Sequence, residues 1–116
     1  MHEMSLMESA LTMVRTMAGE RDIKSVREIC LKVGELSNAM PDALTFAYDV
    51  LHRQKEFQVF SSCILRIEWE ETRAECQLCG TIYQPDQKLL QCPSCHMPGG
   101  VITQGEDLQV LYFEGE

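Results

Sequence analysis

The stretch that decides the fold is Cys76-Gln77-Leu78-Cys79, followed after twelve residues by Cys92-Pro93-Ser94-Cys95. Two residues between cysteines let a tight turn direct both sulfurs at one ion. Two such turns complete a tetrahedron with zinc–sulfur distances of about 2.3 Å. Gly80 directly follows the first pair, where a tight turn often needs positive φ. Because four thiolates leave no open coordination position, the spacing predicts a structural Zn²⁺ site rather than a catalytic one.

Two other interpretations of the four cysteines have to be weighed. Disulfides belong to oxidising compartments, but the first residues lack the basic region and apolar core of a signal peptide. We therefore expect a cytoplasmic protein, in which paired Cys-x-x-Cys spacings favour a metal. Iron in a rubredoxin-like site stays open, because four tetrahedral sulfurs accept either metal.

The composition is that of a soluble globular domain. The chain has 116 residues, of which 45% are hydrophobic and 24% charged. The formal net charge is −8, from 18 acidic and 10 basic residues, and such a surface repels phosphate backbones. No apolar run approaches the ~20 residues of a membrane-spanning helix. We expect neither nucleic acid nor membrane as a partner.

The hydrophobic pattern predicts two helices. Residues 4–19 form the first, because one face carries apolar residues at spacings of three and four: Met7, Ala10, Leu11, Val14 and Met17. Pro41-Asp42 open the second, which fades before Phe57.

Three segments are typical of strands. Residues 25–34 alternate Ile29, Leu31 and Val33 with Glu28, Cys30 and Lys32. Residues 63–71 alternate in the same way, and a last strand covers residues 108–114. The predicted fold is an α+β sandwich of two helices on a three-stranded mixed sheet. Residues 1–73 would form the core, a return strand within 104–116 would complete it, and residues 74–103 would form an inserted zinc-ribbon-like module.

His2 offers a second metal site. An imidazole so near a chain end is usually part of a mobile polar tail. A free α-amine, the next backbone amide nitrogen and an imidazole can, however, wrap one ion in a nearly planar chelate, which suits Ni²⁺ or Cu²⁺. We expect Met1 to supply the amine, and Glu3 could add an amide nitrogen or a carboxylate.

Five stretches in this order resemble one family over essentially the whole chain. They are Met1-His2-Glu3-Met4-Ser5-Leu6, Leu31-Lys32-Val33-Gly34-Glu35-Leu36-Ser37, Cys76-Gln77-Leu78-Cys79, Cys92-Pro93-Ser94-Cys95-His96 and Ile102-Thr103-Gln104-Gly105-Glu106-Asp107-Leu108. Together they look like the HypA/HybF family of nickel metallochaperones for NiFe-hydrogenase maturation. The cysteine pairs alone are common to many zinc ribbons, so the opening Met-His-Glu carries most of the specificity.

The resemblance implies roles for individual residues. His2 would be the principal Ni²⁺ ligand, with the Met1 amine and Glu3 beside it, and the four cysteines would hold structural Zn²⁺. His96 matches a histidine often found after the last cysteine. By itself, a histidine at this position is an exposed turn residue, a proton-sensitive neighbour of the zinc thiolates, or a ligand that can replace one of them. Asp42 is the acidic candidate nearest the nickel site. Gly80 and Thr81 stand where some members carry another histidine.

The resemblance also implies partners. The chain would not be an enzyme but would deliver nickel to a hydrogenase large-subunit precursor, together with the GTPase HypB. The resemblance also allows homodimerisation, and in some organisms the family takes part in urease maturation. One alternative is a zinc-ribbon interaction module in which His2 plays no part. A redox or hydrolytic enzyme using Cys30 or Cys63 is another, although neither cysteine has a histidine nearby in sequence or a nucleophile motif.

Overall fold

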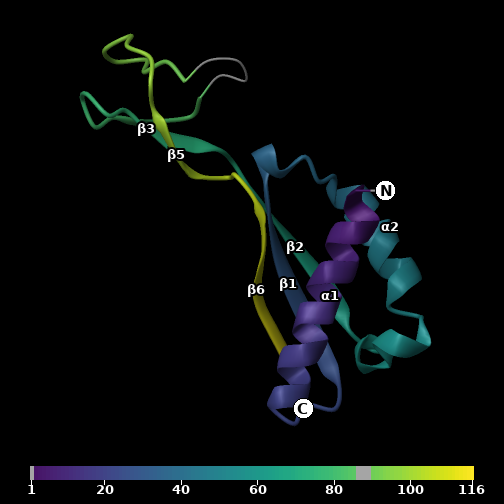
Figure 1. Cartoon of the computed structure of the whole chain (residues 1–116). Coiled ribbons are helices and arrows are strands. Elements are labelled where there is room, and N and C mark those ends of the chain that lie inside the picture. The colour runs from purple at the N-terminus through teal and green to yellow at the C-terminus, as the bar shows by residue number, and fades with distance from the viewer. Residues whose placement is uncertain (1, 86–89) are drawn as a thin grey trace. The chain divides into compact units, whose positions relative to one another are not determined.

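The computed structural model describes residues 2–85 and 90–116. The chain divides into two compact units (Figure 1). Unit 1 comprises Met1–Lys32, Ala39–Glu68 and Gln109–Glu116, and unit 2 comprises Val33–Asn38 and Trp69–Leu108. The predicted boundaries of a zinc module at 74 and 103 stay a prediction.

Helix α1 (His2–Glu20) supplies one apolar face to the core of unit 1. Its buried residues are Met7, Ala10, Leu11, Val14 and Ala18. This is the face that the three- and four-residue spacing predicts, with Ala18 in place of the half-buried Met17. The helix begins two residues earlier than predicted, so His2 is its first residue.

Helix α2 (Pro41–Leu51) begins at the predicted proline. Proline is tolerated in a first turn because the N–H that it lacks has no helical partner there. The buried side chains of α2 are Leu44, Ala47, Tyr48 and Leu51, which is the predicted inner face. A 3₁₀ segment, η2 (Lys55–Phe60), follows and buries Phe57 and Phe60.

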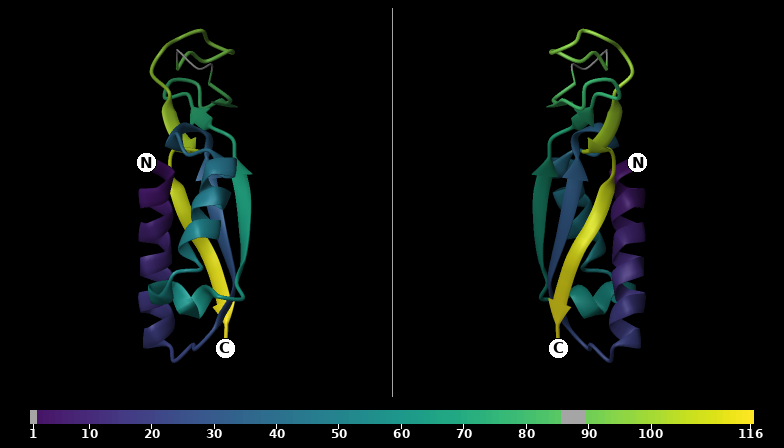
Figure 2. Two further views of the ribbon diagram at one scale, coloured as in Figure 1. Left: turned by 90° about the vertical axis from the view of Figure 1, so that its right-hand side faces the viewer. Right: turned by 90° about the vertical axis from the view of Figure 1, so that its left-hand side faces the viewer.

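The main sheet has three strands in the order β2-β1-β6, with β1 at Val26–Gly34, β2 at Ile64–Glu70 and β6 at Leu108–Gly115. Figure 2 shows β1 and β2 running in one direction and β6 in the other, with α1 and α2 on the same face. The mixed α+β fold is therefore confirmed. Ile29, Leu31 and Val33 are buried as predicted. Cys30 is buried as well, and its neighbours include Arg66 and Tyr112 from the two strands that flank β1.

Unit 2 contains a second, antiparallel sheet that the sequence does not reveal. Its order is β4-β3-β5, with β3 at Arg73–Glu75, β4 at Ile82–Tyr83 and β5 at Val101–Gln104. Strands of two to four residues are too short to show a period of two, so this region reads as turns. A short 3₁₀ segment, η1 (Glu35–Ser37), also belongs to unit 2.

Two glycines of unit 2 permit a close backbone approach. The N–H of Gly34 donates to the carbonyl of Asp107 at 2.9 Å, and the N–H of Leu36 donates to that of Gly105 at 2.8 Å. A Cβ on Gly34 would lie 2.5 Å from the carbonyl carbon of Gly105. Glycine is required here because any side chain would force these backbones apart.

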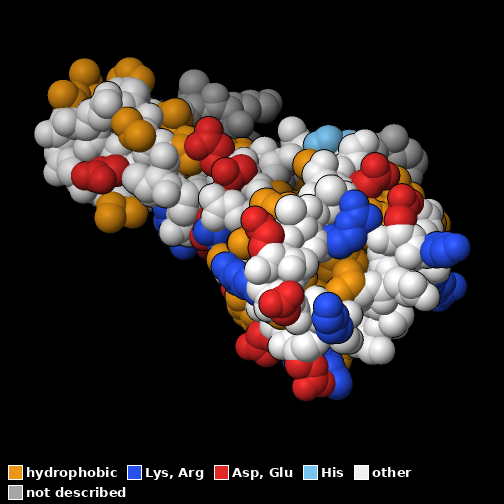
Figure 3. All heavy atoms as spheres, turned by 60° about the horizontal axis from the view of Figure 1, so that its bottom comes forward, with side chains coloured by type: hydrophobic (Ala, Val, Ile, Leu, Met, Phe, Trp, Pro, Cys, Tyr) orange, Lys and Arg blue, Asp and Glu red, His pale blue; other side chains and the backbone are white. Residues whose placement is uncertain are grey.

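The surface carries charge of both signs. On the face shown in Figure 3, acidic and basic side chains are interspersed over unit 1, and hydrophobic side chains gather on unit 2. Four apolar residues of unit 2 are among the most exposed large ones described: Leu78, Ile82, Met97 and Val101. Among the described residues, no helix is both long and apolar enough to cross a membrane.

Candidate metal centre

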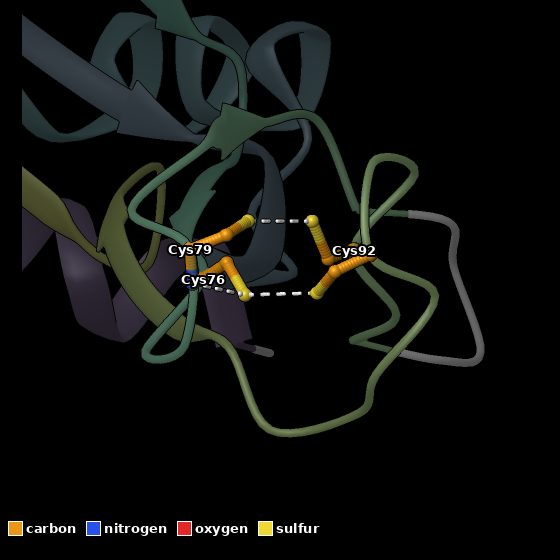
Figure 4. Close-up of side chains that lie close together, drawn as sticks. Cys76, Cys79 and Cys92 are labelled. Atoms are coloured by element: carbon orange, nitrogen blue, oxygen red, sulfur yellow. Dashed lines mark hydrogen bonds between the residues drawn. The ribbon is translucent and has the colours of Figure 1, made fainter.

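The four predicted zinc ligands converge in unit 2. The sulfurs of Cys76, Cys79, Cys92 and Cys95 all lie within 4.8 Å of one another. Cys76 Sγ is 3.6 Å from Cys95 Sγ, and Cys79 Sγ is 3.5 Å from Cys92 Sγ, so the two pairs face each other across the gap in Figure 4. A disulfide needs about 2 Å between sulfurs, so the alternative of two disulfides does not describe this site.

The separations fit a single tetrahedral ion. Four sulfurs placed about 2.3 Å from a common centre lie about 3.8 Å apart, close to the distances found here. All six cysteines are free thiols, and the four at this site offer no nitrogen or oxygen donor. The donor set therefore fits Zn²⁺, and tetrahedral iron remains the alternative that sulfur geometry alone does not separate.

Both cysteine turns are built with the same hydrogen bonds. The N–H of Gly80 donates to the carbonyl of Cys76, and the N–H of His96 donates to that of Cys92, each at 2.9 Å. The N–H of each leading cysteine donates to the carbonyl five residues further on, at 2.9 Å and 3.1 Å. The two turns are thus structural equivalents, and His96 occupies the place that Gly80 occupies in the first.

His96 adopts a conformation that is unusual for its residue type. Its φ is +61°, and that of Gly80 is +76°. Left-handed backbone costs glycine little but costs an L-residue with a side chain roughly 1–2 kcal/mol. The His96 side chain is exposed. The backbone carbonyl of His96 accepts a hydrogen bond from Gln91 Nε2 at 3.0 Å.

The four sulfurs differ in how readily they lose a proton. Hydrogen bonds from the hydroxyl and backbone N–H of Thr81 lower the pKa of Cys79 to about 6. The N–H of Met97 lowers the pKa of Cys95, but burial and the neighbouring sulfurs raise it to about 11. Thiolates this close together repel one another, so the four thiols do not all ionise unless a bound cation neutralises the charge. The cluster is therefore arranged for a metal ion.

A small apolar cluster supports the site. Ala74, Cys76, Tyr83 and Cys92 are buried together, with Leu90, Cys95 and Ile102 packed against them. Gly100 lets the ring of Tyr83 approach, since a Cβ there would lie 2.2 Å from the Tyr83 hydroxyl oxygen. Because this cluster has so few apolar side chains, we expect unit 2 to depend on a bound metal for stability.

The predicted nickel residues lie at the start of α1. Met1 lies outside the described residues, and His2 is exposed as the first residue of α1. The carboxylate of Glu3 accepts a hydrogen bond from the backbone N–H of Met40, with 3.3 Å between Oε2 and N. Asp42 is exposed in the first turn of α2, two residues after Met40.

The remaining two cysteines, Cys30 and Cys63, are buried thiols. Burial raises the pKa of Cys30, and Glu68 and Glu28 raise it further. Burial also raises the pKa of Cys63, and the hydrogen bond linked to Tyr48 offsets only part of this. A raised pKa leaves less of the nucleophilic thiolate, so these residues fit inert core thiols better than an enzymatic nucleophile.

Two features of these sites are absent from the sequence prediction. One is the contact between Glu3 and Met40, which joins residues 37 positions apart and leaves no local pattern. The other is the equivalence of His96 with Gly80. That signal was present in the sequence, because each residue directly follows its cysteine pair.

Comparison with known proteins agrees with this architecture. The sequence model of HypA, described as "Hydrogenase/urease nickel incorporation, metallochaperone, hypA", matches residues 1–115. Hydrogenase maturation factor HypA of Moorella thermoacetica is 31% identical over 116 residues, and HybF of Klebsiella pneumoniae is 34% identical over the same length. Each alignment covers 100% of both chains.

Two solved structures are similar. A solution structure of HypA protein has a TM-score of 0.76 at 25% identity and covers 100% of this chain and 97% of that one. The solution structure of the Ni metallochaperone HypA from Helicobacter pylori has a TM-score of 0.71 at 24% identity, covers 97% and 96%, and shows the shared fold. The chain belongs to the HypA family of hydrogenase and urease nickel-incorporation metallochaperones.

Proposed function

We propose that this chain binds Ni²⁺ at its N-terminal residues and delivers it to the large-subunit precursor of a NiFe-hydrogenase. The observation that carries the proposal is the position of His2, exposed at the first residue of α1. Amides in the first turn of a helix have no intrahelical partner, so metal coordination there sacrifices no helical hydrogen bond.

The proposed Ni²⁺ ligands are one side chain and nitrogens of the main chain. The His2 imidazole is the principal ligand, and the Met1 amine and a backbone nitrogen of the opening residues complete a nitrogen-rich set suited to Ni²⁺. The Glu3 carboxylate is already engaged by the Met40 N–H, which favours the Glu3 amide nitrogen over its carboxylate as a ligand. Asp42 is proposed as an outer neighbour of this site rather than a ligand.

The four cysteines are proposed to bind Zn²⁺ that stays with the protein, while Ni²⁺ is transient cargo. Closed four-sulfur coordination leaves no position from which a metal could readily be handed on. A site on an exposed helix start is different, since protons or incoming ligands can displace its nitrogen donors. HypB, the hydrogenase precursor, a second copy of this chain and urease maturation proteins are the partners proposed, and the setting is proposed to be the cytoplasm.

Nickel calorimetry tests the proposal. The chain has three histidines, so His52→Ala and His96→Ala are matched controls for His2→Ala. We expect Ni²⁺ binding to fall by at least about tenfold, or about 1.4 kcal/mol, in His2→Ala and in a chain extended at its N-terminus, and to persist in both controls. Equal binding by all variants would contradict the N-terminal site. Nickel transfer to the precursor in the presence of HypB and GTP should fail for His2→Ala with zinc content unchanged.

A zinc-ribbon interaction module without a nickel role is the second candidate. The exposed Leu78, Ile82, Met97 and Val101 of unit 2 favour it, because exposed apolar side chains are the material of docking surfaces. The two candidates separate in cells: His2→Ala abolishes hydrogenase maturation under nickel delivery and leaves it intact if the chain acts only through docking.

A further inference from the structure

A polar pocket lies in unit 1, where α2 ends and the 3₁₀ segment η2 begins. Its volume is about 480 Å³, within the ~300–1,000 Å³ range of small-molecule sites. Each lining residue has at least one side-chain N–H or O–H donor: His52, Arg53, Gln54, Lys55, Gln58 and Ser61. None of these six is acidic or apolar, although the chain contains 18 acidic residues. This composition favours an anion over a cation or an apolar ligand.

Arg53 has no partner among the residues that the structure describes. The other arginines each take part in an ion pair, a hydrogen bond or a contact with an aromatic ring: Arg15, Arg21, Arg27, Arg66 and Arg73. Lys55 likewise forms no ion pair within the described part of the chain. In a chain with a net charge of −8, two unpaired cations that line one pocket are available to an anion from outside.

The ring of His52 is held in place by Tyr48. Its Nδ1 lies 2.8 Å from the carbonyl oxygen of Tyr48, and because a carbonyl only accepts, this Nδ1 carries a proton. The ring also stacks on that of Tyr48, with 4.7 Å between the centroids and 8° between the planes. Nε2 is therefore the ring nitrogen left for a ligand. It can accept a hydrogen bond from hydrogen phosphate or, once protonated, donate one to a phosphate oxygen.

We propose that this pocket binds the phosphate group of a small ligand. A phosphate monoester carries a charge of about −1.5 to −2 and three strong acceptor oxygens. These match the guanidinium of Arg53, the ammonium of Lys55 and the neutral donors around them. A carboxylate has one charge and two oxygens, so it would leave donors of the pocket without a partner. The volume also leaves room for part of the molecule that carries the phosphate.

The end of α2 does not by itself account for the pocket. The negative end of a helix dipole favours cations, which would explain His52 and Arg53 directly after Leu51. This effect falls off within one turn. Lys55 begins η2 and Ser61 follows it, so the dipole of α2 gives neither residue a reason to line the same pocket.

The pocket is separate from the proposed nickel residues. Glu3 contacts the other end of α2, through the backbone N–H of Met40 directly before Pro41. The 11 residues of α2 span about 16 Å at 1.5 Å per residue, and Figure 1 shows this helix running away from the N-terminus. His2→Ala should therefore leave phosphate binding unchanged, and the two proposals can fail independently.

Titration of the full zinc-loaded chain with inorganic phosphate at constant ionic strength, followed by ¹H–¹⁵N NMR, tests the site. We expect saturable shifts of amides within residues 52–61. Arg53→Gln and Lys55→Gln should each weaken binding by at least about tenfold, because each removes a charged donor from the pocket. Lys24→Gln is the matched control, because Lys24 is an exposed lysine of unit 1 that does not line the pocket. It should leave the affinity unchanged.

Two further probes define the ligand. Acetate at the same ionic strength should give no saturable shift. Adenosine 5′-monophosphate separates the sources of the phosphate: tighter binding than inorganic phosphate supports a phosphate ester as ligand, and equal binding supports the phosphate group alone. Circular dichroism confirms that every variant is folded. The proposal is overturned if the native chain gives no saturable shift at residues 52–61, if acetate binds as well as phosphate, or if Lys24→Gln weakens binding as much as Lys55→Gln.

Discussion

The carboxylate of Glu3 accepts a hydrogen bond from the backbone N–H of Met40, with 3.3 Å between Glu3 Oε2 and Met40 N. Met40 is the residue directly before α2, so this bond ties the first turn of α1 to the start of α2. It also places the proposed nickel residues beside a second structural element. A metal that displaces the start of α1 would therefore also change the environment of the Met40 amide.

The Glu3–Met40 contact should be lost in acid. Hydrogen bonds from the backbone N–H of Glu3 itself, and secondly from that of Met40, lower the pKa of Glu3 below the ordinary glutamate value. A carboxyl whose pKa is lowered by folding stabilises the folded state above its unfolded pKa, and this contribution is lost as the pH falls through the lowered value. The Met40 amide chemical shift should therefore titrate with a midpoint below about 4.3. Glu3→Gln should abolish the transition, and a midpoint at or above the ordinary value would contradict the contact.

Glu3 also allows the amide and carboxylate ligand choices to be separated. Glu3→Gln removes the charge but keeps the backbone N–H, whereas Glu3→Pro removes the N–H at a helix position where proline is tolerated. We expect Ni²⁺ affinity to change little in Glu3→Gln and to fall by at least about tenfold in Glu3→Pro. Calorimetry checks both, with far-UV circular dichroism confirming that α1 is retained. The reverse order of affinities would assign the carboxylate as the ligand.

The equivalent turn positions Gly80 and His96 should respond to mutation in opposite directions. No heavy atom lies within 4 Å of a Cβ added to Gly80, so Gly80→Ala tests backbone conformation without a clash. It should destabilise the zinc-loaded protein by about 1 kcal/mol, and His96→Gly should stabilise it by a similar amount. Thermal unfolding monitored for unit 2 measures both. If His96→Gly is destabilising, the imidazole makes a contribution that its exposure does not suggest.

Gly105 should tolerate no side chain. Its φ is +84°, and a Cβ there would lie 2.6 Å from the Cα of Thr72 and 2.8 Å from the carbonyl oxygen of Glu71. Gly105→Ala should cost at least about 2 kcal/mol of unfolding free energy, since a rare backbone conformation and a clash with backbone combine. Gly19→Ala is the control: nothing lies within 4 Å of its added Cβ, and alanine in α1 should stabilise by about 0.5–1 kcal/mol. Equal effects of the two would contradict the packing.

Removing the metal should affect unit 2 selectively. A strong chelator should expose its amides to hydrogen exchange, while α1 and α2 keep their far-UV signal, because the apolar cluster at the cysteines contains no residue of either helix. Thiol titration reports on the same event. Cys76, Cys79, Cys92 and Cys95 should become reactive on chelation, and the buried Cys30 and Cys63 should stay slow. Six rapidly reacting thiols would instead indicate that unit 1 also depends on the metal.

The sequence predicts the elements that are long enough to show a repeating hydrophobic pattern. The apolar spacing of α1 and the proline that begins α2 locate both helices, because a face packed on a core must repeat every three to four residues. The burial of Cys30 was less predictable, since it depends on side chains of the two strands that flank β1. The strands β3, β4 and β5 leave no pattern at all, because they are short and depend on the turns beside them.

By itself, the sequence determined the two cysteine pairs and the residues at the chain start, since local spacing fixes which donors a tight turn can present together. Only the tertiary structure decided that all four sulfurs meet within 4.8 Å, and that Glu3 is held by the start of α2. It also decided that His96 adopts the left-handed conformation of a glycine and that β6 lies at an open edge. The physical reason is distance along the chain. Contacts between residues far apart in sequence depend on how the elements pack, and no local preference encodes them.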